Sequence, residues 1–177
     1  MLLSTAQVCV AQIGISPSYF DLTQAEAQRT QSFRLTNFGA EPVHIRTELV
    51  PFDIDGKGDA VEIEPNERSL ERHLAVSPIE FEIPPRGQQV VRFSLRPVES
   101  LVPGEYRHMV YFRFGGMASV GGQVSFPLSY RIGGAVYVQV GDPDRSASLE
   151  KIETVDGREV AFDLRSTGTS NAWMQGR

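Results

Sequence analysis

Cysteine and histidine are scarce in this chain of 177 residues. The single cysteine, Cys9, excludes an intrachain disulfide and a cysteine-based metal site. The three histidines are scattered, and no Gly-x-Ser-x-Gly, His-Glu-x-x-His or phosphate-loop pattern occurs. The sequence therefore predicts a protein that is not an enzyme and that holds no cofactor and no metal ion.

Clustered positive charge and long apolar runs are also lacking. The formal net charge is −5, and the basic residues are dispersed, which argues against nucleic acid as a partner. After the N-terminus no apolar run is long enough to span a bilayer, so we expect no membrane insertion. A content of 41% hydrophobic and 22% charged residues is typical of a soluble protein with a proper core.

Residues 1–12, MLLSTAQVCVAQ, form a short apolar stretch with small residues near its end. This pattern is typical of the back half of a secretory signal, with cleavage expected near Ala11, although the positive start of such a signal is missing. The alternative is that residues 1–12 are a buried first strand. We favour an exported protein from which the signal is removed.

Strand patterns dominate the rest of the chain, because residues that favour strands alternate or cluster between turn signals. About seven such runs predict an all-β protein, an antiparallel β-sandwich over residues 13–141. Glycine pairs at 115–116 and 121–122 predict a loop between the last two strands. Residues 23–28 and 66–73 look helical but are short, so we expect a turn or one short helix at most. The predicted strands are 13–22, 29–37, 42–54, 79–85, 88–97, 105–114 and 124–140.

Strand alternation assigns the predicted faces. Val91, Phe93 and Leu95 are expected to point into the core. On the strand 105–114, His108 shares a face with large apolar residues, so it is expected to be a core residue rather than a general base. Glu80 and Glu82 alternate with apolar residues and indicate a solvated strand face, not a paired-carboxylate site.

Residues 142–177 restart the pattern with a strand, an Asp156-Gly157 turn and a second strand. So few strands cannot bury a sandwich core. The segment is either a short element packed on the first domain or the start of a second β domain, and we favour an incomplete second β-sandwich domain.

An acidic loop raises the question of calcium. Asp53, Asp55, Gly58 and Glu64 stand at positions 1, 3, 6 and 12 of an EF-hand-like loop. Lys57, however, stands where a ligand oxygen belongs, and no helices flank the loop. We expect a solvated hairpin tip; a calcium-dependent adhesion domain is the weaker alternative.

The stretch GQVSFPLSYRIGG, residues 122–134, is the remaining candidate site. Residues 123–130 carry no charge, although edge strands are normally protected by charge. Pro127 cannot donate to a ladder and marks an edge. The strand either packs on its own core or pairs with another chain by β-augmentation. The alternating residues that would then contact the partner are Val124, Phe126, Leu128 and Tyr130.

Several stretches follow one another in a distinctive order: ISPSYFDL with FRLTNFGAEPVHI, SPIEFEIPPRGQQVVRFSLRP, LVPGEYRHMVYFRF and AVYVQVGDP. Together they resemble the PapD-like periplasmic chaperones of pilus assembly. The resemblance implies two immunoglobulin-like domains and a non-enzymatic chaperone of pilin or fimbrial subunits. It also implies that the last strand of the first domain is lent to a subunit, which an outer-membrane usher then receives.

This chain departs from the family at its basic residues. The family's two carboxylate-binding basic positions read Ser18-Tyr19 and Gly133-Gly134 here, and Arg131 is the nearest candidate anchor. Glu105 matches an acidic domain-junction residue, whose arginine partner is replaced by Val138 or Gln139. The alternative function is a PapD-like or immunoglobulin-like structural or adhesion module of the cell envelope without strand donation.

Overall fold

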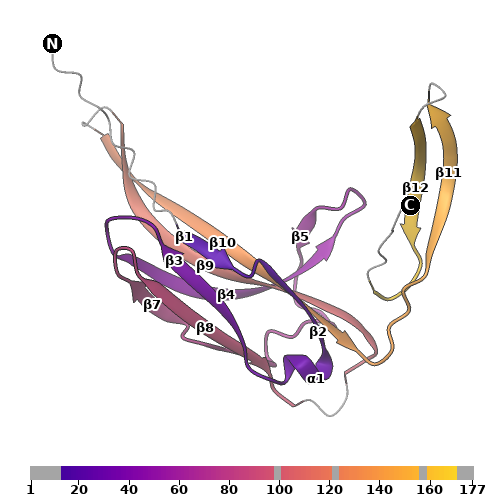
Figure 1. The fold of residues 1–177 in the computed structure, drawn as a ribbon, viewed down its shortest axis with the longest axis horizontal. Helices are drawn as coiled ribbons and strands as arrows, with labels where there is room; N and C mark the ends of the chain where they lie inside the picture. The colour runs from indigo at the N-terminus through magenta and orange to yellow at the C-terminus, as the bar shows by residue number, and fades with distance from the viewer. Residues whose placement is uncertain (1–12, 98–100, 121–123, 156–158, 171–177) are drawn as a thin grey trace.

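The computed structural model describes residues 13–97, 101–120, 124–155 and 159–170, so the predicted signal segment 1–12 lies outside the described residues. The described chain is almost entirely strands (Figure 1). The short helix α1, Gln24–Ala27, begins at a capping box in which Thr23 and Glu26 bond each other's backbone N–H. No helix in the described ranges is long and apolar enough to cross a bilayer.

Two sheets form the predicted β-sandwich, and every pair of strands in them is antiparallel except β2 with β10. The first sheet has the order β1 (Ile13–Ser16), β3 (Gln31–Asn37), β8 (Gln88–Leu95), β6 (Leu74–Ser77). The second has the order β2 (Tyr19–Thr23), β10 (Val124–Val140), β9 (Gly104–Val120), β4 (Val43–Ile54), β5 (Ala60–Glu62), and β7 (Glu80–Ile83) also pairs with β4.

The prediction of one strand over 13–22 is wrong. Pro17 has no N–H to donate, and β1 ends just before it. The chain then crosses from the first sheet to the second, where β2 begins at Tyr19. Two short strands, β5 and β6, were not predicted. Residues 66–73 form turns, so α1 is the one short helix that the two helix-like stretches supply.

The core lies between the sheets and centres on four phenylalanines. Phe33 and Phe93 stack at 5.3 Å, Phe20 meets both edge-on at 5.0 Å, and Phe112 meets Phe33 edge-on at 5.8 Å. Such edge-on and stacked pairs stabilise a core beyond the area they bury. The predicted inward faces of β8 and β9 are confirmed, because Val91, Phe93, Leu95, Tyr106, His108, Val110, Phe112 and Phe114 are all buried.

His108 is a core residue, as predicted. Its Nε2 accepts a hydrogen bond of 3.1 Å from the Leu70 N–H and lies 3.4 Å from Glu71 Oε2, while Nδ1 has no partner among the described residues. Burial lowers the pKa of His108, and the Glu71 carboxylate opposes this effect.

The lowered pKa of His108 makes stability depend on pH. The unfolded chain takes up a proton near pH 6.5, before the folded chain does, so the free energy of unfolding falls as the pH drops from about 7 through this value to the folded pKa. We expect His108→Gln to reduce this fall, measured by urea unfolding between pH 7 and pH 5. Equal pH dependence in both proteins would contradict the assignment.

Strands β9 and β10 form a ribbon of 17 residues each. The predicted loop at Gly115-Gly116 is wrong, because β9 continues through both glycines to Val120. Beyond Phe114, β9 no longer pairs with β4, so the end of the ribbon extends from the sandwich as two strands (Figure 1). Glycine was a misleading signal here, since antiparallel pairing along the ribbon overrides its preference for turns.

Gly134 on β10 is a point of close packing. A Cβ at this position would lie 2.3 Å from Phe33 Cε1 and 3.1 Å from Ile15 Cδ1. A glycine here lets the strand approach the aromatic core directly, and any side chain would displace Phe33.

We therefore expect Gly134→Ala to lower the free energy of unfolding by about 1–3 kcal/mol, because the methyl group overpacks the core. Gly116→Ala on β9 is the matched control, since its Cβ would meet nothing within 4 Å. Urea denaturation measures both. Equal unfolding midpoints for the two variants would show that Phe33 does not limit this position.

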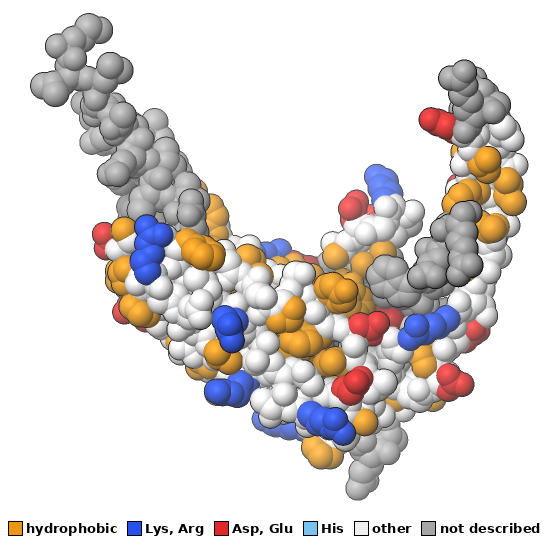
Figure 2. All heavy atoms as spheres, in the orientation of Figure 1, with side chains coloured by type: hydrophobic (Ala, Val, Ile, Leu, Met, Phe, Trp, Pro, Cys, Tyr) orange, Lys and Arg blue, Asp and Glu red, His pale blue; other side chains and the backbone are white. Residues whose placement is uncertain are grey.

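Residues 142–177 contribute a separate two-stranded sheet, β11 (Ala147–Val155) and β12 (Glu159–Ser166). All of β12 is exposed, and apolar side chains gather on this hairpin (Figure 2). The exposed apolar residues are Leu149, Ile152, Val160, Phe162 and Leu164. A lone hairpin of this kind is only marginally stable, so the second β domain stays a prediction here.

Candidate functional site

The outer edge of β10 is the first component of the site. One edge of β10 pairs with β9 along its whole length, from Val124 to Val140. The other edge pairs with β2 only over Ala135–Gln139, and the Ala135 N–H also donates to the Ser18 carbonyl at 3.0 Å. Within the described ranges no strand pairs with this edge over Val124–Gly134, which we call the free edge.

The positions predicted to contact a partner continue the core face of β10. Val136 and Val138 point into the core, and by strand alternation positions 124, 126, 128 and 130 lie on the same face. Leu128 is half-buried, while Tyr130 is 42% exposed and stacks on Phe114 at 5.8 Å. The side chains of Val124 and Phe126 lie outside the described residues.

Small residues of β9 stand opposite apolar residues of β10 in the ribbon. The register places Leu128 opposite Gly116, and Phe126 opposite Ala118. A Cβ at Gly116 would meet nothing within 4 Å, so the face beside Leu128 is open. Pro127 is exposed on the other face, as expected for an edge.

Arg131, the candidate carboxylate anchor, already has a carboxylate partner. Its guanidinium forms an ion pair with Glu62 of β5 and lies over the Tyr111 ring, 4.2 Å from the ring centroid. Burial and the nearby Glu62 carboxylate raise the pKa of Tyr111. No sequence pattern indicates this cluster, because β5 lies far from β10 in the chain.

The four residues at the places of the family's basic residues, Ser18-Tyr19 and Gly133-Gly134, lie at one end of the free edge. A Cβ at Gly133 would lie 2.8 Å from Met109 Sδ, so this position, like Gly134, is closely packed. Ser18 and Tyr19 form the start of the β2 pairing with β10. These four positions therefore shape the end of the free edge.

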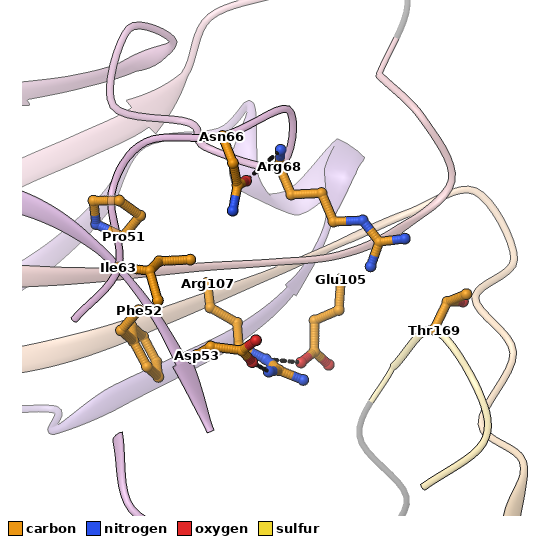
Figure 3. Close-up of a pocket in the computed structure, with 9 residues that line it drawn as sticks. All are labelled: Pro51, Phe52, Asp53, Ile63, Asn66, Arg68, Glu105, Arg107 and Thr169. Atoms are coloured by element: carbon orange, nitrogen blue, oxygen red, sulfur yellow. Dashed lines mark hydrogen bonds and ion pairs between the residues drawn. The ribbon is translucent and has the colours of Figure 1, made fainter. Parts of the chain in front are cut away.

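Glu105 lies where the C-terminal segment meets β9 (Figure 3). Its N–H donates to the Thr169 carbonyl at 3.2 Å, and its carboxylate accepts a hydrogen bond of 2.9 Å from the Ser170 hydroxyl. Arg107 Nε donates to Glu105 at 2.7 Å and also pairs with Asp53 of β4. A small cavity of about 90 Å³ lies here, and its lining includes Glu105, Arg107, Asp53, Thr169 and Arg68.

The positions expected to replace the family's junction arginine have other contacts. Val138 is buried in the core. Gln139 donates to Asp21 at 2.7 Å and accepts a hydrogen bond from Arg145. Arg107 is an arginine partner of Glu105 at this junction, and sequence patterns did not single it out.

The acidic loop forms a hairpin tip between β4 and β5. The N–H groups of Lys57 and Asp59 donate to Asp55 Oδ1 at 2.8 and 2.9 Å, which lowers the pKa of Asp55. Asp53 pairs with Arg107. Over the residues that the structure describes, no three His, Cys, Asp or Glu side chains are grouped so as to hold a metal ion.

Since these carboxylates already bind the turn backbone and Arg107, we expect calcium to leave the melting temperature unchanged. Differential scanning fluorimetry at millimolar calcium, with magnesium as the control, measures this. A rise of several degrees with calcium alone would favour the calcium-dependent adhesion domain.

The fold is that of solved fimbrial chaperones, as the PapD-like resemblance implies. A chain from the chaperone–tip adhesin complex of CFA/I fimbriae superposes with a TM-score of 0.59 at 13% identity, covering 90% of this chain and 68% of that one. The class 5 fimbriae chaperone CfaA gives 0.58 at 14% identity, with coverage of 89% and 68%.

A structure from a different pilus system shares the fold. The CsuC–CsuE chaperone–tip adhesion subunit complex of archaic chaperone-usher Csu pili of Acinetobacter baumannii gives a TM-score of 0.54 at 15% identity, covering 90% of this chain and 78% of that one. No protein-family model and no curated protein sequence matches the chain.

Proposed function

We propose that this chain is a periplasmic chaperone of fimbrial subunits that lends β10 to an incomplete subunit. The observation that carries the proposal is the free edge Val124–Gly134, whose apolar face continues the core face of the same strand. The chaperone fold supports binding rather than catalysis as the activity.

Strand addition explains how such a surface recognises a subunit. The unpaired N–H and C=O groups of the free edge offer ladder hydrogen bonds, which supply affinity without regard to sequence. The alternating positions 124, 126, 128 and 130 then fix the register, because a slip by one residue would turn every apolar side chain to the wrong face.

The cellular setting follows from this role. The chaperone covers the subunit's apolar groove until an outer-membrane usher receives the subunit, and the apolar segment 1–12 serves as the remnant of the export signal.

Two further residues have roles in this proposal. Arg131 is the candidate anchor for a carboxylate of the subunit, and Glu105 orients the second domain.

Co-expression with a fimbrial subunit and a pull-down test the proposal. We expect Phe126→Arg or Leu128→Arg to reduce recovery of the subunit at least about tenfold, because a charge would be buried in its apolar groove. Ser129→Arg is the matched control, since Ser129 is exposed and its position lies on the opposite face.

Circular dichroism separates the two interpretations of the strand. If Phe126→Arg and Leu128→Arg fold normally and lose the subunit while Ser129→Arg retains it, strand donation is supported. If the subunit is retained by all variants, or if the arginines unfold the protein, β10 serves its own domain, and a structural or adhesion module of the envelope is the better description.

A further inference from the structure

The backbone N–H and C=O groups of β10 point alternately to its two edges, as in any strand. The Ala135 N–H donates to the Ser18 carbonyl, so position 135 faces the edge that β2 shares with the free edge. The Leu128 carbonyl faces β9, because a Cβ at Gly115 would lie 3.3 Å from its oxygen. The register between β9 and β10 runs without a shift, so the odd-numbered residues from 125 to 133 face the free edge.

Pro127 belongs to this outward-facing set. Its ring takes the place of the N–H, so it offers a carbonyl but no donor. The other members, Ser125, Ser129, Arg131 and Gly133, keep their N–H groups. The proline costs the β9–β10 ladder nothing, since its backbone faces away from β9 and the pairing continues through it. This explains how a proline can lie inside a strand of 17 residues.

The position of Pro127 determines how far another strand can pair with the free edge. Next to β2, such a strand would meet the N–H groups of Gly133, Arg131 and Ser129 in succession. At Pro127 its carbonyl would receive no hydrogen bond, and the ring would hold its backbone away. A carbonyl buried without a partner costs more free energy than one ladder bond contributes. The continuous ladder is therefore confined to residues 129–133.

We propose that Pro127 is a gap that ends the ladder between β10 and a bound subunit strand. The subunit is then held by backbone hydrogen bonds over Ser129–Gly133, and by side chains alone at positions 124 and 126. This inference rests on the proposed function and adds the residue that limits the strength of the complex. The same gap limits pairing with unintended strands, a known use of proline on sheet edges.

Amide hydrogen exchange, measured by nuclear magnetic resonance, tests the geometry without any partner. We expect the Leu128 and Tyr130 N–H groups, which face β9, to exchange slowly, and those of Ser129 and Arg131 to exchange fast. In Pro127→Ala, the new N–H at position 127 should exchange as fast as that of Ser129. Protection at position 127 equal to that of Leu128 would overturn the proposal, because the gap would then face β9.

Dissociation of the subunit recovered in the pull-down tests the effect of the gap. We expect Pro127→Ala to slow dissociation about two- to tenfold, the size of one ladder hydrogen bond, and to protect the N–H at position 127 in the complex. Ser129→Pro should widen the gap and weaken binding at least about fivefold. Ser129→Ala is the matched control, since it keeps the N–H, and should bind as the parent protein does.

The outcomes separate the gap from the proposed function. Unchanged dissociation of Pro127→Ala, with position 127 still unprotected in the complex, would overturn the gap while the subunit is still bound. If circular dichroism shows that Ser129→Pro does not fold, Pro127→Ala alone decides. If no subunit binds any variant, the proposed function fails, and the exchange rates of the free protein still decide whether position 127 faces the free edge.

Discussion

The structure depends on how the backbone of β10 is paired. A strand of 17 residues has β9 on one side throughout, but β2 on the other side over only Ala135–Gln139. The stretch paired on both sides lies in the core and fixes the strand's position, while the free edge Val124–Gly134 keeps its outward N–H and C=O groups available. A single rigid element thus serves as both core strand and exposed edge.

Close packing holds this arrangement in place. Gly134 lets β10 approach Phe33, and the four phenylalanines around it tie the two sheets together. The same glycine excludes a long basic side chain at this point. The nearest cation is consequently Arg131, on the outer face, where Tyr111 and Glu62 set its orientation.

Much of the fold could be predicted from local patterns, because alternation reports which face of a strand is buried. The bounds of β10 and the inward face of β8 follow directly from apolar spacing. The break at Pro17 was missed because the flanking residues have strand composition on both sides. The Arg131–Glu62 pair could not be predicted, since it depends on a hairpin that turns back over the sheet, and no periodicity encodes that approach.

Because β9 extends beyond its pairing with β4 after Phe114, a small rotation at the base of the ribbon produces a larger displacement at its end. Six residues of β9, from Gly115 to Val120, extend past the last pairing with β4. At about 3.3 Å per residue they place the end of the ribbon roughly 20 Å from the sandwich. A rotation of about 10° at Phe114 and Tyr130 would therefore displace a chain held at the tip by about 3.5 Å, close to one residue of strand register.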